Sequence, residues 1–167
     1  HKIEIVSKCG IVNPSDRYAG VSVSHYDTSR EHIFNSVDAS LKNMATDYLD
    51  LLLIHRQDPF LDHHETGKAL DDIIKSGKVK EVGVSNFKSW DFTLLQSAMK
   101  SHLVTNQIEM SLAATDSFTN GDLAFHQEQA TTIMAWSPLG GGKLMKDKGI
   151  LGKALKKIAV NQNVDIA

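Results

Sequence analysis

The segment Asp47-Tyr-Leu-Asp-Leu-Leu-Leu-Ile-His55 decides the fold class, because an unbroken apolar run ends directly at a histidine. Short runs of branched apolar residues are typical of parallel strands that are buried on both faces. The segment Val79-Lys-Glu-Val-Gly-Val-Ser-Asn86 has a similar pattern and ends on two polar residues. We therefore expect parallel strands with polar side chains at their carboxyl ends.

Outward from these two segments, strand-like and helix-like stretches alternate about five times, which favours βα units and an α/β fold. Thr28 and Glu31 fit a capping box, and Gly77 is the residue type that ends a helix in a left-handed conformation. The stretch from Ile11 to Thr28 reads as an extended loop. The expected strands are Ile3–Val6, Leu49–Ile54, Val79–Val84, Val104–Ile108 and Ile133–Trp136. The expected helices run from about Ser29 to Met44, from before Leu70 to Gly77, from Ser89 to Met99, from Asp122 to Gln129 and from Leu151 to Val160, the last packing Leu151, Leu155 and Ile158 on one side.

The composition is that of an ordinary soluble domain, with 167 residues, 41% hydrophobic and 23% charged. A net charge of −2 and scattered Lys and Arg residues argue against nucleic-acid and anionic-membrane partners. The single cysteine, Cys9, excludes an intramolecular disulfide and leaves no thiolate set for zinc. No apolar run approaches the roughly 20 residues that span a bilayer. We expect a cytoplasmic protein with no metal site.

Polar residues follow the expected strands at five places, and each has an ordinary explanation when it is taken alone. A strand-end lysine is usually a solvated cation, Ser and Asn often cap helices or begin turns, and a glycine triplet is weak support for a phosphate loop. A lone histidine there is more often structural, and a tryptophan belongs by default to the core. The five places are Ser7-Lys8, Ile54-His55, Ser85-Asn86, Asn106-Gln107 and Ala135-Gly142.

Their shared position changes these odds, because parallel α/β folds bring the carboxyl ends of their strands to one crevice. The amides of Asn86 and Gln107 suit a ligand that carries a carboxamide, whereas Lys8 and His55 suit negative charge that develops on a carbonyl oxygen. A nicotinamide ring above the indole of Trp136 would connect these groups.

The chain resembles the aldo-keto reductases. The similarity lies in Ile5-Val-Ser-Lys-Cys9, Asp47–His55, Gly77-Lys-Val-Lys-Glu-Val-Gly-Val-Ser-Asn-Phe87, Asn106-Gln-Ile-Glu109 and Ala135-Trp-Ser-Pro-Leu-Gly140. The resemblance implies a (β/α)₈ TIM barrel, of which this chain would hold about five βα units, the third to seventh strands. We accordingly expect residues 1–167 to form a single domain, a partial barrel truncated at both ends.

The resemblance also implies roles for individual residues. Lys8 and His55 match the lysine and histidine of the family's catalytic tetrad. Trp136 falls where an aromatic ring stacks on the nicotinamide. The remaining cofactor-binding positions are Ser85, Asn86 and Gln107 for the carboxamide, and Ser137, Leu139, Gly140 and Gly142 for the pyrophosphate.

The implied activity is reduction of an aldehyde or ketone by hydride transfer from NADPH, with NADH as the other possible cofactor. In the family the tetrad's tyrosine and aspartate precede the lysine, and Tyr18, Tyr26 and Tyr48 all follow it here. We expect a small-molecule carbonyl substrate and a monomer when the protein is complete. The alternative is a non-catalytic nucleotide-binding sensor or regulatory protein on the same barrel.

Overall fold

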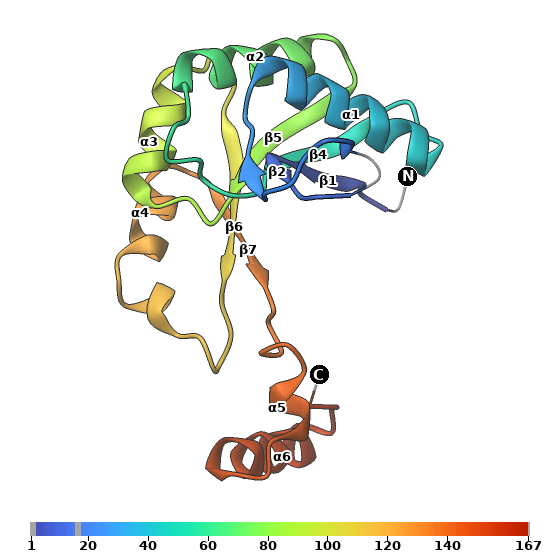
Figure 1. The fold of residues 1–167 in the computed structure, drawn as a ribbon. Helices are drawn as coiled ribbons and strands as arrows, with labels where there is room; N and C mark the ends of the chain where they lie inside the picture. The colour runs from blue at the N-terminus through green and yellow to red at the C-terminus, as the bar shows by residue number, and fades with distance from the viewer. Residues whose placement is uncertain (1–2, 16–17, 167) are drawn as a thin grey trace.

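The computed structural model describes residues 3–15 and 18–166, and its centre is a five-stranded parallel sheet with the order β1-β4-β5-β6-β7 (Figure 1). A small antiparallel pair, β2 and β3, lies within the expected loop from Ile11 to Thr28. The strands are β1 (Val6–Cys9), β2 (Ile11–Val12), β3 (His25–Tyr26), β4 (Leu49–Ile54), β5 (Val79–Ser85), β6 (Leu103–Glu109) and β7 (Thr132–Trp136).

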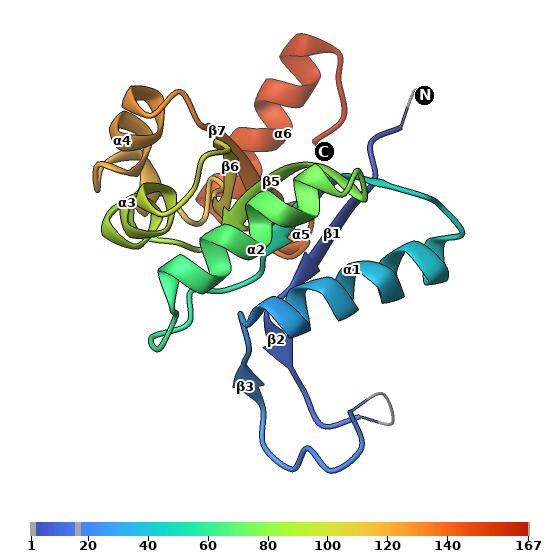
Figure 2. The ribbon, with the colours of Figure 1, turned by 90° about the horizontal axis from the view of Figure 1, so that it is seen from above.

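Helices connect successive strands of the sheet, as right-handed βα crossovers require. Figures 1 and 2 show α1 and α2 side by side along the sheet, followed by α3 and α4. The helices are α1 (Arg30–Met44), α2 (His63–Lys75), α3 (Ser89–Ser97), the 3₁₀ helix η2 (Asp116–Phe118), α4 (Asp122–Glu128), α5 (Lys143–Lys146) and α6 (Ile150–Gln162).

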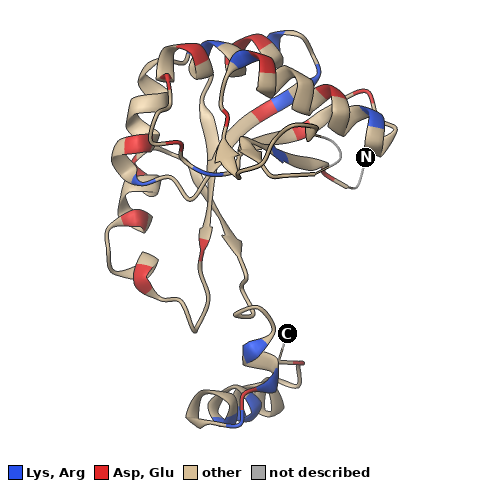
Figure 3. Cartoon of the chain, in the orientation of Figure 1, with Lys and Arg blue, Asp and Glu red and all other residues tan. Residues whose placement is uncertain are grey.

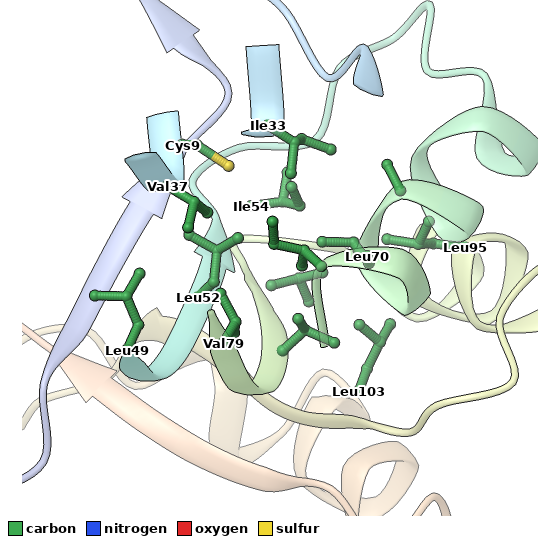
Figure 4. Close-up of a cluster of buried hydrophobic side chains, with 14 of the residues drawn as sticks. Cys9, Ile33, Val37, Leu49, Leu52, Ile54, Leu70, Val79, Leu95 and Leu103 are labelled. Atoms are coloured by element: carbon green, nitrogen blue, oxygen red, sulfur yellow. The ribbon is translucent and has the colours of Figure 1, made fainter. Parts of the chain in front are cut away.

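The hydrophobic core lies between this helical layer and one face of the sheet (Figure 4). Ile33 of α1 and Leu70 of α2 are fully buried against Leu52 and Ile54 of β4. Burying one such side chain stabilises the fold by about 1.5–3 kcal/mol. Strand alternation then sends the intervening residues to the opposite face, called here the inner face.

The inner face is tightly packed around Gly83 of β5. A Cβ atom at this position would lie 2.6 Å from the Thr105 carbonyl oxygen and 3.0 Å from Leu53 Cδ2. Only a residue without a side chain fits between β4 and β6 at this level. Leu53, Gly83 and Thr105 therefore form one layer of the inner face. Because strand side chains alternate, the position of this layer determines which residues form the next layer of the same face.

Each expected strand overlaps an observed one, but only Leu49–Ile54 keeps both of its expected boundaries. β1 begins at Val6 and not at Ile3, so Lys8 lies within the strand, paired with Leu53. Ser85 is the last residue of β5, and β6 continues through Gln107 to Glu109. Backbone pairing with neighbouring strands carries each strand past its apolar run, which hydropathy alone does not report.

The capping box expected at Thr28 is wrong. Ser29 is the N-cap of α1, and its Oγ accepts a hydrogen bond from the His32 amide at 3.2 Å. Thr28 is buried, and its carbonyl oxygen accepts from Thr66 Oγ1 of α2 at 2.9 Å. The end expected at Gly77 is confirmed, because this residue follows the C-cap of α2 with a φ of 80°.

The packing expected for the last helix is also wrong. Leu151 and Ile158 are 36% and 57% exposed, because α6 contacts α5 and lies apart from the helices over the sheet (Figure 1). Figure 3 shows several lysines on α5 and α6, whereas α1 and α2 carry both signs of charge. Among the described residues, no helix combines the length and the apolar character needed to cross a bilayer.

We predict that Gly83→Ala destabilises the protein by about 1–3 kcal/mol, because the new methyl group would press on a backbone oxygen that cannot rotate away. Thermal or urea unfolding of the whole protein measures the change. Gly149→Ala is the control, since the nearest atom to its new Cβ is a side-chain oxygen of Asp147, and it should change stability by less than about 0.5 kcal/mol. Equal effects at the two positions would contradict the packing argument.

Candidate active site

The inner face carries a row of polar and aromatic side chains near the carboxyl ends of the strands. Cys9, Ile54 and Val84 belong to the core, so the alternating positions in β1, β4 and β5 point to the inner face. Gln107 follows Thr105 on that face, and Trp136 follows Met134, which contacts Gln107. The residues on this face are Lys8, His55, Ser85, Gln107 and Trp136. They lie at successive levels, because Lys8 pairs with Leu53, Ser85 with Gln107 and Trp136 with Glu109.

Asn86 connects three of the strands. Its Oδ1 accepts a hydrogen bond from Trp136 Nε1 at 2.9 Å, and its Nδ2 donates to Ser85 Oγ at 2.8 Å and to the His55 carbonyl oxygen at 3.4 Å. Its backbone φ is 62°, a left-handed conformation that asparagine tolerates better than most residues. One side chain therefore fixes the edge of the indole and the end of β4 together.

Ser85 and Gln107 extend this network across β5 and β6. Ser85 Oγ donates to the Gln107 carbonyl oxygen at 3.0 Å, and the same oxygen accepts from the Asn86 amide at 2.9 Å. Gln107 Nε2 lies 2.9 Å from Met134 Sδ, a weak acceptor that a stronger one would readily replace. The amide of Gln107 is thus held in place with capacity to bind a ligand.

The pKa of His55 is lowered below its usual value of 6.5, first because the imidazole is partly buried and then because Lys8 and Arg56 add positive charge nearby. The folded protein therefore holds His55 neutral at pH 7. A neutral imidazole keeps one N–H, which can donate to a carbonyl oxygen. Lys8 is exposed and supplies a cation close to that ring.

An open pocket of about 510 Å³ lies beside Trp136 and Asn86, and Arg56 and Glu109 also line it. The guanidinium carbon of Arg56 lies 6.0 Å from the centre of the Trp136 ring. Lys8, His55 and Gln107 are not among the residues that line this pocket. The predicted residues thus lie on one face of the sheet, but only two of them, Asn86 and Trp136, line this pocket.

The glycine segment after β7 forms a tight turn. Ser137, Gly140 and Gly142 have φ values of 50°, 58° and 82°. The amide of Gly140 donates to the Ser137 carbonyl at 2.8 Å, and that of Gly142 donates to the Leu139 carbonyl at 3.0 Å. These two N–H groups are engaged within the turn, so a phosphate that used them would have to displace those bonds.

Sequence reasoning missed Arg56 and Met134. Arg56 directly follows His55 at the end of a strand, which is a signal that could have found it. Met134 gives no such signal, because its contact with Gln107 depends on the pairing of β6 with β7.

We predict that Lys8→Met raises the pKa of His55 toward 6.5, because the substitution removes one of the cations that oppose protonation. NMR titration of the His55 ring in the whole protein measures the value. Lys153→Met on α6 removes the same charge far along the chain and should leave the titration unchanged. A His55 midpoint above 6.5 in the unmodified protein would contradict the geometry.

Comparison with known proteins gives a consistent result. A family model described as the aldo/keto reductase family matches residues 1–165. The 6-dehydroglucose reductase of Agrobacterium fabrum is 62% identical over 165 residues, which cover 98% of this chain and 56% of that protein. The chain spans about half the length of the curated relatives it matches.

Solved structures agree with this result. A thermostable aldo-keto reductase in complex with the inhibitor epalrestat matches with a TM-score of 0.74 and 29% identity, over 83% of this chain and 50% of that one. The aldo/keto reductase of Klebsiella pneumoniae in complex with NADP and acetate matches with a TM-score of 0.73 over 98% of this chain and 53% of that one; at 24% identity it supports the fold alone. The expected TIM-barrel architecture is confirmed, with five of its parallel strands described here. The chain belongs to the aldo/keto reductase family.

Proposed function

We propose that the whole protein is an NADPH-dependent reductase that converts an aldehyde or ketone to an alcohol, and that this chain supplies its nicotinamide site and two catalytic residues. The observation that carries the proposal is the bonded network of Asn86, Ser85, Gln107 and Trp136 at the carboxyl ends of the strands. In parallel α/β folds this edge of the sheet is where ligands bind.

The donors and acceptors of this network fit a nicotinamide. The Asn86 Oδ1 accepts one bond from Trp136 and has a second lone pair, while the Gln107 Nε2 is paired only with a thioether among the described residues. The carboxamide of a nicotinamide has an N–H that needs an acceptor such as Asn86 Oδ1 and a carbonyl oxygen that needs a donor such as Gln107 Nε2. Trp136 offers the ring face for stacking, and Ser137, Leu139, Gly140 and Gly142 would lie near the pyrophosphate. Bound NADPH would supply the hydride.

Lys8 and His55 would act on the substrate oxygen. The neutral His55 ring would donate its N–H to the carbonyl and hold it in position. Lys8 would place a cation beside the proton donor and keep the pKa of that donor low. By the family pattern the donor is a tyrosine that matches none of Tyr18, Tyr26 and Tyr48.

An oxidised sugar is the substrate class we propose first. The reason is the 62% identity to a protein named 6-dehydroglucose reductase. We further propose that the protein acts as a cytoplasmic monomer, with a small molecule and no nucleic acid or membrane as its partner. Size-exclusion chromatography with light scattering would test the monomer.

We predict that Lys8→Met lowers kcat by roughly 10²-fold or more in the whole protein, because the proton donor loses the cation that sets its pKa. The Kd for NADPH should change little. Steady-state oxidation of NADPH with 6-dehydroglucose and with a simple aldehyde measures kcat, and Lys153→Met is the matched control. Unchanged turnover with Lys8→Met would remove Lys8 from the chemistry and leave only a cofactor-binding scaffold.

We predict that Asn86→Gly weakens NADPH binding by about 1–3 kcal/mol, because a buried carboxamide loses its partner. Glycine is the preferred replacement, since the φ of 62° at this position would strain an alanine. Quenching of Trp136 fluorescence by NADPH measures the Kd. Unaltered affinity would place the nicotinamide elsewhere.

A further inference from the structure

Two buried polar residues on the helix side of the sheet have no part in the site described so far. Asn106 of β6 is 0% exposed and His126 of α4 is 1% exposed. Neither lies on the inner face. Buried polar groups are costly unless they are paired, so their position beneath the site calls for an explanation.

Asn106 holds the backbone of Phe87 at two points. Its Nδ2 donates to the Phe87 carbonyl oxygen at 2.8 Å, and its Oδ1 lies 3.4 Å from the Phe87 amide nitrogen, which donates to it. Phe87 directly follows Asn86, beyond the last residue of β5. The side chain of Asn106 thus replaces sheet pairing at the point where the strand has ended.

His126 holds that amide from its other side. Its Nε2 lies 3.0 Å from Asn106 Nδ2. Because Nδ2 must donate to the Phe87 carbonyl, it faces the histidine with its second N–H, and Nε2 must accept. His126 therefore carries its proton on Nδ1, a tautomer assigned from the hydrogen-bond network.

The fold retains this tautomer at a cost. His126 Nδ1 is buried and has no hydrogen-bond partner among the described residues. The ring is fixed edge-on against Phe92 of α3 and Phe125 of α4, with centroid separations of 5.3 Å and 5.0 Å. A leucine would fill this aromatic environment without an unpaired donor, so packing alone does not explain a histidine here.

We propose that Asn106 and His126 are positioning residues for the cofactor site: His126 holds the Asn106 amide in place, Asn106 fixes the Phe87 backbone, and Asn86 is thereby held in the left-handed conformation that contacts Trp136. The inference rests on the proposed cofactor site only in naming the ligand. The chain of contacts from α4 to Asn86 is complete in the described residues.

Three substitutions of His126 in the whole protein test the proposal. His126→Leu removes the acceptor and should weaken NADPH binding by roughly 3- to 10-fold, while kcat at saturating NADPH changes by less than about twofold. His126→Gln places an amide oxygen near the position of Nε2 and should restore the affinity to within about twofold. His126→Asn is one carbon too short to reach Asn106 and should behave like the leucine variant.

Leu95→Ala is the control for a merely structural effect. Leu95 is fully buried in the core and takes no part in the contacts from His126 through Asn106 to the Phe87 backbone, called here the clamp. Its loss should lower the Tm and leave the Kd for NADPH unchanged. Equal Kd values for the leucine, glutamine and asparagine variants would overturn the proposal, as would a Kd that follows Tm through the whole set.

The glutamine and asparagine pair keeps the test decisive if the leucine variant does not fold. A protein that binds NADPH but reduces no carbonyl compound would contradict the proposed reaction and leave the clamp to be judged by the Kd series. If the protein reduces the carbonyl compound but the Kd values of the His126 variants do not differ, only this inference is contradicted.

Discussion

The parallel register between β4, β5 and β6 is the constraint on which the rest of the structure depends. Gly83 brings β5 and β6 so close that the Thr105 carbonyl would clash with any side chain there. This close packing fixes the pairing of the strands, and the pairing determines that Lys8, His55, Ser85 and Gln107 all point to the inner face. Because the side-chain period of a strand is two, a slip of one residue would turn Lys8 and His55 toward the core and turn core residues such as Cys9 and Ile54 toward the inner face. The core and the candidate site are thus two consequences of one pairing.

Asn86 shows how the end of a strand becomes a binding surface. The strand ends at Ser85, and the chain turns away there although the Asn86 backbone amide still donates to the Gln107 carbonyl oxygen. A left-handed asparagine accomplishes this turn and turns its side chain toward the indole of Trp136. Asn106 and His126 lie beneath Asn86 and place hydrogen-bonding groups where apolar groups would cost less desolvation free energy. In our proposal these two residues position the backbone rather than fill space.

The sequence predicted the five strands of the parallel sheet and the helices between them, because dense apolar runs and helical periods mark them, as at Leu49–Ile54 and Arg30–Met44. It did not predict the short elements β2, β3, η2 and α5. It also placed Lys8, His55, Asn86, Gln107 and Trp136 on strand ends, although β1 and β6 carry two of these within the strand.

Three kinds of feature could not be predicted from the sequence. Thr28 and Ser29 are adjacent residues that can both cap a helix, and only the extended backbone at Ser29 identifies it as the N-cap of α1. The exposure of Leu151 and Ile158 depends on where α6 lies, which periodicity does not encode. The contacts of Arg56, Met134 and His126 depend on pairing between elements that are distant in sequence.

The turn after β7 reverses the handedness of the backbone over a short distance. Gly140, Gly141 and Gly142 all have positive φ, and a Cβ at Gly141 or Gly142 would meet nothing within 4 Å. Space is therefore not what excludes other residues there; chirality is. At Gly141 the positive φ lies in the region that a D-amino acid prefers and in which L-alanine is strained. The three glycines thus have the left-handed backbone conformation that L-residues rarely adopt. Stereochemistry restricts the sequence of this turn even where a side chain would touch no neighbour.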